Sequence, residues 1–313
     1  MNDLISPVHI LAEVAKAIPQ DCHQHVIIIG SLAAGYHFFK DDEGRTLRTK
    51  DVDCMFAPSA KAVVVARGVA EQLFDAKWTY RESPDWPAPG TADAPDEKLP
   101  LVRLNPPGSD EWFIELLGAP EERQDAPRGR NHVRLETRYG HFTLCSFGYL
   151  GLVEHKPLRT EFGIQIASPE MMALANLLHH PHIGPEFMSG DQFGRRIKRS
   201  NKDLGRVLAL AHLTPTQELE TWPQKWIEAL EAKYAGQAQD LAFSAGSGLR
   251  ELLDSAEDMH QAHLTCSRGL LASMDVRLEA LQATGQRLMA DVIEPLEEMA
   301  RPTEGRQKPE SAG

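Results

Sequence analysis

Two acidic residues separated by one position are the part of this sequence best suited to chemistry. Asp51 and Asp53 flank Val52, and both carboxylates point the same way in a β-strand, because successive side chains alternate between its faces. Two ionised carboxylates held side by side repel each other, which raises a pKa unless a cation neutralises them. Mg²⁺ binds carboxylate oxygens and leaves its other positions to water or substrate phosphates. The pair predicts a site for Mg²⁺ or Mn²⁺; the alternative, for the pair taken alone, is a solvent-exposed strand face.

A third acid, Glu115, lies within Glu111–Leu117 and has large apolar residues on both sides. A carboxylate in the middle of an apolar strand is costly to desolvate unless it is paired or bound to a metal. If Glu115 lies on a strand next to that of Asp51 and Asp53, the three acids would hold two cations roughly 3.5 to 4 Å apart, as in enzymes of phosphoryl transfer.

Gly30 and Ser31 follow the β-branched run 25–29 and precede a helix-forming segment. Glycine allows close approach of the backbone, and the serine hydroxyl and the first amides of a helix can bind phosphate. The dipeptide predicts a phosphate contact beside the acids.

A cationic segment occurs in the second half of this acidic chain. Several of its residues, three or four positions apart, share one helical face and could bind a triphosphate, with Lys202 the favoured contact. A solvated basic face paired with acids of the same protein is the alternative. The face is formed by Arg195, Arg199, Lys202 and Arg206, while Arg196 and Lys198 point elsewhere.

Taken together, a strand ending in Gly-Ser, then Asp-x-Asp, then an acid on a later strand resembles the nucleotidyltransferase superfamily. Within that superfamily the chain is most similar to the AbiEii-type toxins and related bacterial proteins, which carry an Arg-x-Ser/Thr-x-Asp-x-Asp run and a helical second half with a Lys-Asp pair. The residues that carry this resemblance are Arg48, Thr49, Lys50, Asp51 and Asp53, followed by Lys202 and Asp203.

The resemblance implies a Mg²⁺-dependent enzyme that moves a nucleotide from an NTP to a hydroxyl of RNA, such as a tRNA, of a protein, or of a small molecule. A role as a toxin or in phage defence, with a cognate antitoxin as partner, is implied in the same way. Catalysis and metal binding fall to Asp51, Asp53 and Glu115, and nucleotide or phosphate binding to Gly30, Ser31, Arg48, Thr49, Lys202 and Asp203.

Two other functions are compatible with the same residues. The stretch from Gly30 to Asp51 is longer than is usual in the superfamily, which favours a non-catalytic nucleotide-binding or interaction module of the same fold. A metal-dependent phosphohydrolase or nuclease could also use three acids, with water as the acceptor.

The composition of the chain limits the classes of protein to which it could belong. The 313 residues carry 33 Lys+Arg and 45 Asp+Glu, a formal net charge of −12, which weakens any function in which the whole surface binds nucleic acid. No apolar run approaches the roughly 20 residues of a membrane helix, and no signal peptide is recognisable, so we expect a cytoplasmic protein with no membrane partner. The four cysteines lack zinc-type spacing.

Periodicity predicts an α+β protein with two domains. Residues 1–165 are expected to form a nucleotidyltransferase-like mixed sheet of five or six strands with flanking helices, 166–300 a helical domain that closes one wall of a cleft, and 301–313 a disordered tail. Strands are expected at 25–29, 51–56, 78–81, 101–104, 111–117, 132–137 and 142–145. Helices are expected at 7–18, 32–39, 59–74, 168–178, 193–213, 223–234 and 256–299, the first three capped or opened by Ser6, Gly30-Ser31 and Ser59.

Overall fold

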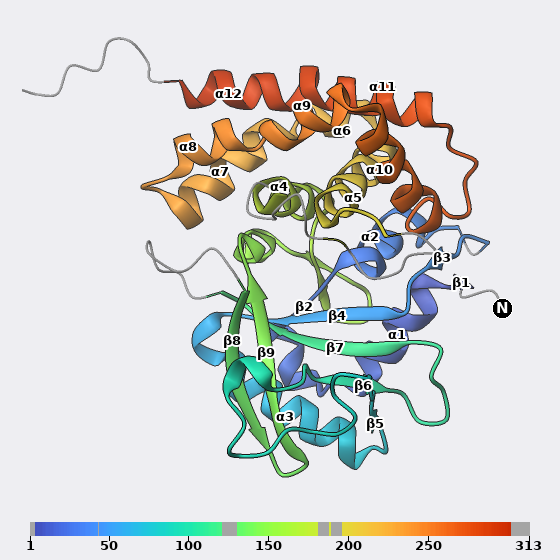
Figure 1. Ribbon diagram of the computed structural model, residues 1–313, viewed down its shortest axis with the longest axis vertical. Coiled ribbons are helices and arrows are strands. Elements are labelled where there is room, and N and C mark those ends of the chain that lie inside the picture. Colours follow the sequence, from blue (N-terminus) through green and yellow to red (C-terminus); the bar gives the residue numbers. More distant parts are fainter. Residues whose placement is uncertain (1–3, 43, 121–129, 181–187, 189–195, 302–313) are drawn as a thin grey trace, which may run out of the picture.

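The computed structural model describes residues 4–42, 44–120, 130–180, 188 and 196–301. It is a mixed α+β structure with a sheet-containing part and a helical part stacked along the long axis (Figure 1). Among the helices of the described residues, none combines the length and the apolar composition needed to cross a membrane.

The main sheet runs in the order β10-β11-β2-β4-β7-β6-β5, with β9 also paired to β7 and β8 to β9. Its central pairs are β2 with β4, which are antiparallel, and β4 with β7, which are parallel. Its strands are β2 (Val26–Ile29), β4 (Asp51–Phe56), β5 (Thr79–Tyr80), β6 (Arg103–Asn105), β7 (Phe113–Gly118), β8 (Arg130–Thr137), β9 (Gly140–Phe147), β10 (Leu158–Arg159) and β11 (Gln165–Ile166).

The sheet buries one face of its central strands completely. Val52 and Cys54 of β4, and Ile114 and Leu116 of β7, have no exposed surface. Because side chains alternate along a strand, the odd-numbered residues of both strands point to the other face, toward the helical part. This alternation separates the apolar core from the acidic side chains.

Three helices accompany the sheet. The side chain of Ser6 caps the first of them by accepting a hydrogen bond from the His9 amide at 3.4 Å. Ser59 does not act as a cap as expected, because the third helix already begins at Ser59, with Pro58 in the cap position. The three helices are α1 (Pro7–Ala17), α2 (Gly30–Phe39) and α3 (Ser59–Asp75). A two-stranded ribbon of β1 (Leu4–Ile5) and β3 (Leu47–Arg48) lies beside them.

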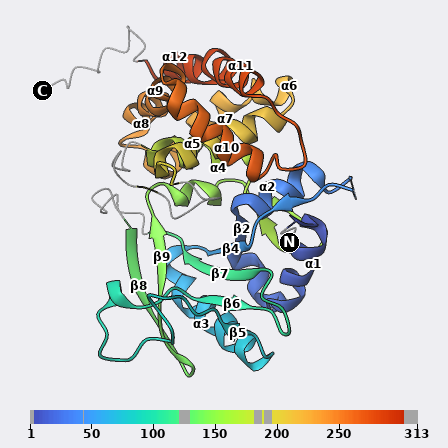
Figure 2. The ribbon, with the colours of Figure 1, turned by 45° about the vertical axis from the view of Figure 1, so that its right-hand side comes forward.

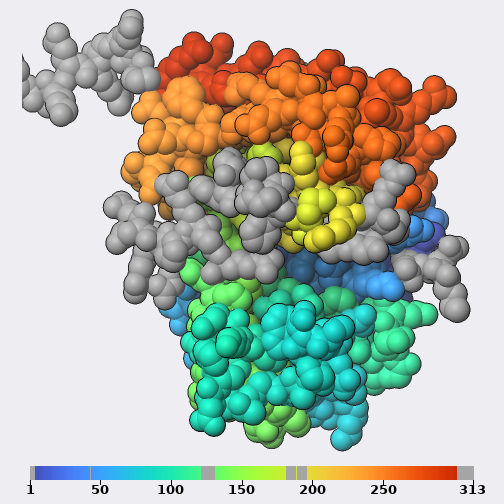
Figure 3. All heavy atoms as spheres, viewed as in Figure 1, coloured from blue at the N-terminus to red at the C-terminus, as the bar shows by residue number. Residues whose placement is uncertain are grey.

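The helical part lies across the sheet, above it in Figure 1 and in the turned view of Figure 2. Figure 3 shows the same two layers as solid bodies. The core of the helical part includes Trp222 and Trp226, both fully buried. Its helices are α4 (Pro169–His179), α5 (Arg199–Leu213), α6 (Thr216–Leu219), α7 (Trp222–Tyr234), α8 (Ala238–Ser244), α9 (Ser247–Asp254), α10 (Ala256–Arg268), α11 (Leu278–Leu288) and α12 (Glu294–Ala300), with a π-helical turn, η5 (Met289–Ile293), joining the last two.

Several expected boundaries were wrong. The sheet of the described residues has nine strands instead of five or six, because two-residue strands extend its edges. The helix expected over 256–299 stops at Gly269, whose φ of −114° and ψ of −115° are not helical, and resumes at Leu278. The helix expected from 193 begins at Arg199 within the described residues. The expected tail, apart from Arg301, lies outside the described residues.

Candidate active site

A cavity of about 590 Å³ lies between the sheet and the helical part. Its lining comes from both parts of the chain, beginning at Ile29 and ending at Leu270. It includes all nine residues singled out in the sequence, namely Gly30, Ser31, Arg48, Thr49, Asp51, Asp53, Glu115, Lys202 and Asp203. The structure thus brings into one cavity residues that are up to 173 positions apart in the chain.

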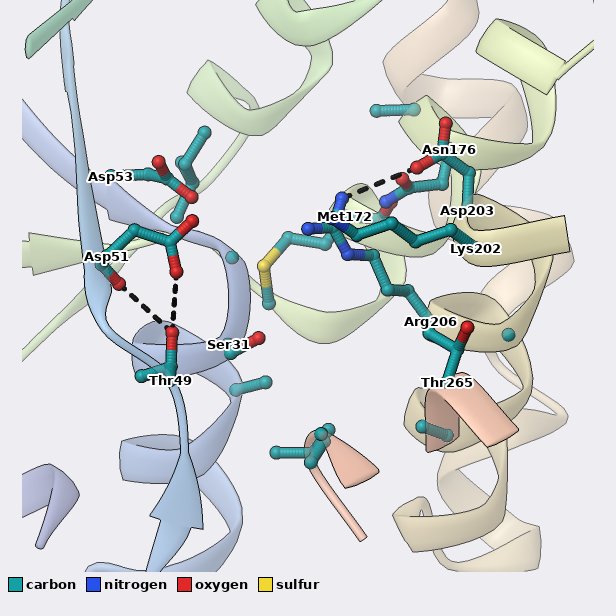
Figure 4. Close-up of a pocket in the computed structure, with 18 of the residues that line it drawn as sticks. Ser31, Thr49, Asp51, Asp53, Met172, Asn176, Lys202, Asp203, Arg206 and Thr265 are labelled. Atoms are coloured by element: carbon teal, nitrogen blue, oxygen red, sulfur yellow. Dashed lines mark hydrogen bonds and ion pairs between the residues drawn. The ribbon is translucent and has the colours of Figure 1, made fainter. Parts of the chain in front are cut away.

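Three carboxylates lie on the wall that the sheet contributes, together with the basic residues Arg48, Lys50 and Arg103. Asp53 on β4 lies directly opposite Glu115 on β7, whereas Asp51 lies opposite the apolar Phe113. The hydroxyl of Thr49 donates a hydrogen bond to Asp51 Oδ1 at 2.6 Å, which fixes that carboxylate (Figure 4). The three acids therefore share one sheet face, with Asp53 between the other two.

The two aspartates differ in their electrostatic surroundings. Burial, together with the charges of Asp51 and Glu115, raises the pKa of Asp53 well above its usual value. Burial also raises the pKa of Asp51, but the Thr49 hydrogen bond and the charges of Arg206 and Lys202 outweigh that effect, so its pKa is lowered. Asp53 is thus the member of the pair that most needs an added cation.

Gly30 begins α2 directly beside Asp53. Its φ of +72° lies in the left-handed region, and a Cβ at this position would come within 2.8 Å of Asp53 Oδ2. Gly30, Ser31 and Ala34 all line the cavity, so the N-terminal turn of α2 opens onto it. Glycine is required here both by the backbone conformation and by the carboxylate that packs against it.

We expect Gly30→Ala to lower the free energy of unfolding by about 1 to 2 kcal/mol, since alanine is strained in the left-handed region and its methyl group would displace the Asp53 carboxylate. Denaturant unfolding measures the loss. Gly68→Ala is the matched control, because a Cβ there has no atom within 4 Å. Equal stabilities of the two variants would contradict the close approach of Gly30 and Asp53.

Cations form the opposite wall, which α5 contributes. Lys202 and Arg206 extend from α5 toward Asp51 and Asp53 (Figure 4), and Arg199 also lines the cavity. This confirms the expected shared face for these three residues; Arg195, expected on the same face, lies outside the described residues. Lys198 points elsewhere, as expected, and pairs with Asp258 at 2.7 Å.

Asp203 is fully buried behind this cationic wall. Its Oδ1 lies 3.3 Å from Arg206 Nη1 and 3.7 Å from Arg199 Nε, and its Oδ2 lies 3.4 Å from His179 Nδ1. Burial raises the pKa of Asp203, but His179 and the two guanidinium groups more than offset this and lower it. A carboxylate in these contacts helps to orient the two arginines.

Lys202 is the most strongly perturbed cation of the cavity. Burial and the charges of Arg206 and Arg199 lower its pKa to about 8, although Asp51 and Asp203 act in the opposite direction. A polyanion entering the cavity would favour the charged form of this amine.

The lining residues that were not predicted to take part include the polar side chains of Arg103, Asn176 and His179. The amide of Asn176 donates to the Met172 carbonyl at 2.7 Å, and His179 reaches Asp203. Arg103 is the most consequential, because its Nε donates to Glu115 Oε2 at 2.6 Å. The only sequence signal for Arg103 was its place in an otherwise apolar strand.

The fit of the site to a divalent cation differs among the acids. Within the described residues, no group of three or more His, Cys, Asp or Glu side chains converges in a way that could hold a metal ion. Glu115 accepts a hydrogen bond from Arg103. Asp51 and Asp53 share a face, and the charge of Asp51 contributes to the raised pKa of Asp53. The two aspartates therefore fit a Mg²⁺ or Mn²⁺ ion by charge and donor type.

Comparison of the chain with protein-family models, with curated proteins and with solved structures gave no match.

Proposed function

We propose that this protein is a Mg²⁺-dependent nucleotidyltransferase that moves a nucleotide from an NTP to a hydroxyl group. The observation that carries the proposal is one cavity in which Asp51 and Asp53 on the sheet side face Lys202 and Arg206 of α5. A metal–triphosphate complex has the same separation of charge, with the metal attracted to the aspartates and the phosphates to α5.

Each wall has its own task in this reaction. Asp51 and Asp53 hold Mg²⁺, which when bound supplies positive charge beside the reacting phosphate. Lys202 and Arg206 bind the triphosphate, assisted by the first turn of α2. The acceptor oxygen forms a bond to the α-phosphorus, the bond to the bridging oxygen breaks, and pyrophosphate leaves with the electron pair. Glu115 receives the proton of the hydroxyl.

Arg48 and Thr49 have smaller parts in the proposal. Arg48 lines the cavity at the end of β3 and is assigned to the phosphates. Thr49 holds Asp51 in place through its 2.6 Å hydrogen bond and acts as a positioning residue.

The acceptor is a hydroxyl of RNA, of a protein or of a small molecule. The resemblance to AbiEii-type toxins extends the proposal to a toxin or phage-defence role, for which a cognate antitoxin would be the partner.

Transfer of label tests the proposal. The purified protein is incubated with each α-³²P-labelled NTP, Mg²⁺ or Mn²⁺, and total RNA plus protein extract. We expect label to enter one of these fractions, or a small product, only with the wild type and not with Asp51→Ala/Asp53→Ala. Cleavage products without adducts would instead indicate a phosphohydrolase.

A second candidate is a non-catalytic nucleotide-binding module, and the ion pair of Arg103 with Glu115 favours it because it engages the third acid. This candidate predicts NTP binding without release of pyrophosphate. Calorimetry with each NTP, performed on the preparation used for labelling, separates the two functions.

We expect affinity for ATP to fall as the pH rises above about 8, because Lys202 then loses its charge while free and must regain a proton on binding. The dissociation constant should rise by up to about tenfold per pH unit. Calorimetry from pH 7 to 9.5 measures it. Lys202→Met should bind weakly at every pH, and a flat wild-type profile would contradict this role of Lys202.

A further inference from the structure

Three charged side chains form a row across neighbouring strands. Asp53 on β4 is paired in register with Glu115 on β7, and Glu115 is paired in register with Arg103 on β6. Adjacent strands are about 4.8 Å apart, so each side chain has the next one in the row as its immediate neighbour. Glu115 therefore has a carboxylate on one side and a guanidinium on the other.

The guanidinium of Arg103 is held in this row by two contacts. Its Nε donates to Glu115 Oε2 at 2.6 Å, and its Cζ lies 5.8 Å from the centre of the Phe113 ring. Phe113 is two residues before Glu115 on β7 and so lies on the same face. A charged hydrogen bond and a cation–π contact together keep the positive charge beside Glu115.

Glu115 is well shielded in this arrangement, with 13% of its side chain exposed, compared with 36% for Arg103. A partly buried carboxylate bound by a guanidinium has its negative charge already compensated. The three acids and Arg103 together carry two negative charges, which one divalent cation balances. A second divalent cation beside Glu115 would have to compete with Arg103 at short range and would be repelled by it.

We propose that Arg103 takes the place of a second metal ion, so that the cavity binds one divalent cation, through Asp51 and Asp53. This replaces the two-cation arrangement expected from the sequence, and it agrees with the finding that no three acids of the described residues converge in a way that could hold a metal ion. The inference rests on the proposed function, because it takes the aspartates as metal ligands.

Counting bound Mn²⁺ tests the inference without any turnover. Electron paramagnetic resonance and equilibrium dialysis are performed on the full chain with a saturating non-hydrolysable NTP analogue. For the wild type we expect one protein-bound Mn²⁺ and no spin-coupled pair. Arg103→Gln should bind a second Mn²⁺ and show the coupled signal, because the guanidinium that pairs with Glu115 is then gone. Arg103→Lys should still bind one Mn²⁺, because lysine keeps a positive charge beside Glu115.

Arg81→Gln is the matched control: Arg81 lies against the same Phe113 ring, 4.5 Å from its centre, but it donates hydrogen bonds to Asn105 and to the Asp110 carbonyl. It should bind one Mn²⁺, and circular dichroism checks that every variant is folded.

A coupled pair in the wild type, or one ion in Arg103→Gln, would overturn the inference and leave the proposed function standing. Absence of Mn²⁺ binding by the wild type would overturn both. If Arg103→Gln does not fold, a coupled Mn²⁺ pair in the wild type or in Arg103→Lys would still overturn the inference.

Discussion

Asp53→Asn is expected to reduce nucleotidyl transfer by a factor on the order of 10³ or more while leaving the protein at least as stable as the wild type. Activity is lost because Asp53 is one of the two carboxylates assigned to the metal. Stability is retained because burial and the charges of Asp51 and Glu115 oppose ionisation of Asp53 and raise its pKa. A carboxyl whose pKa is raised on folding destabilises the protein at high pH. The loss of stability develops as the pH rises from the pKa of the carboxyl in the unfolded chain to its pKa in the folded protein. Asparagine removes that charge and keeps the shape.

Thermal unfolding without divalent metal, together with the labelling assay, measures both effects. Asp85→Asn, an exposed acid in the loop after β5, is the control and should change neither. Wild-type turnover by Asp53→Asn would refute the assignment of the metal ligand. A loss of several kcal/mol in stability would show that Asp53 is already well compensated in the free protein.

Asp203→Asn is expected to have the largest effect on stability, a loss of about 3 kcal/mol in the free energy of unfolding. Asp203 has no exposed surface, and it compensates the charges of Arg199 and Arg206. Without it, Arg199 and Arg206 would lose the buried carboxylate that they both contact. The pKa of Asp203 is lowered on folding, so its contribution is complete at neutral pH and is lost as the pH falls through its folded value.

Urea unfolding at pH 7 and again at acidic pH measures this contribution. The difference between wild type and Asp203→Asn should shrink as the pH falls. Asp254→Asn, an exposed acid at the end of α9, serves as the control. Adding Arg206→Met to Asp203→Asn should recover part of the loss, since it removes one uncompensated cation. A loss below about 1 kcal/mol would contradict the role given to Asp203.

The sequence predicted the members of the site better than their contacts. The spacing of Asp51 and Asp53 was enough to place them on one face, because a strand has a period of two. The helical spacing of Arg199, Lys202 and Arg206 likewise predicted their shared face. The pairing of Arg103 with Glu115 was not predictable, because it depends on which strands are neighbours and in what register. The burial of Asp203 depends in the same way on the packing of α4 against α5.

Strand positions were predicted where apolar and polar residues alternate over several positions, as in β4, whose bounds Asp51–Phe56 are confirmed. Of the two-residue strands at the sheet edges, β5 lies within the strand expected at 78–81. The strand β10 was not foreseen, because so short a strand is defined by pairing with a partner and leaves no period in the sequence. The expected domain boundary after residue 165 falls within β11, where Ile166 pairs with Ile28 of β2. The helical break at Gly269 was hidden by apolar residues that continue on both sides of it.

The opposed walls of the cavity also couple its two ligands thermodynamically. In the free protein, the cations of α5 are among the charges that favour ionisation of Asp51, so each wall partly neutralises the other. A metal ion alone would leave the cations without that partner, and a triphosphate alone would leave the carboxylates without theirs. Binding of either ligand should therefore increase affinity for the other by the same factor, as linkage requires. The concentration of free Mg²⁺ would then set the apparent affinity for the nucleotide.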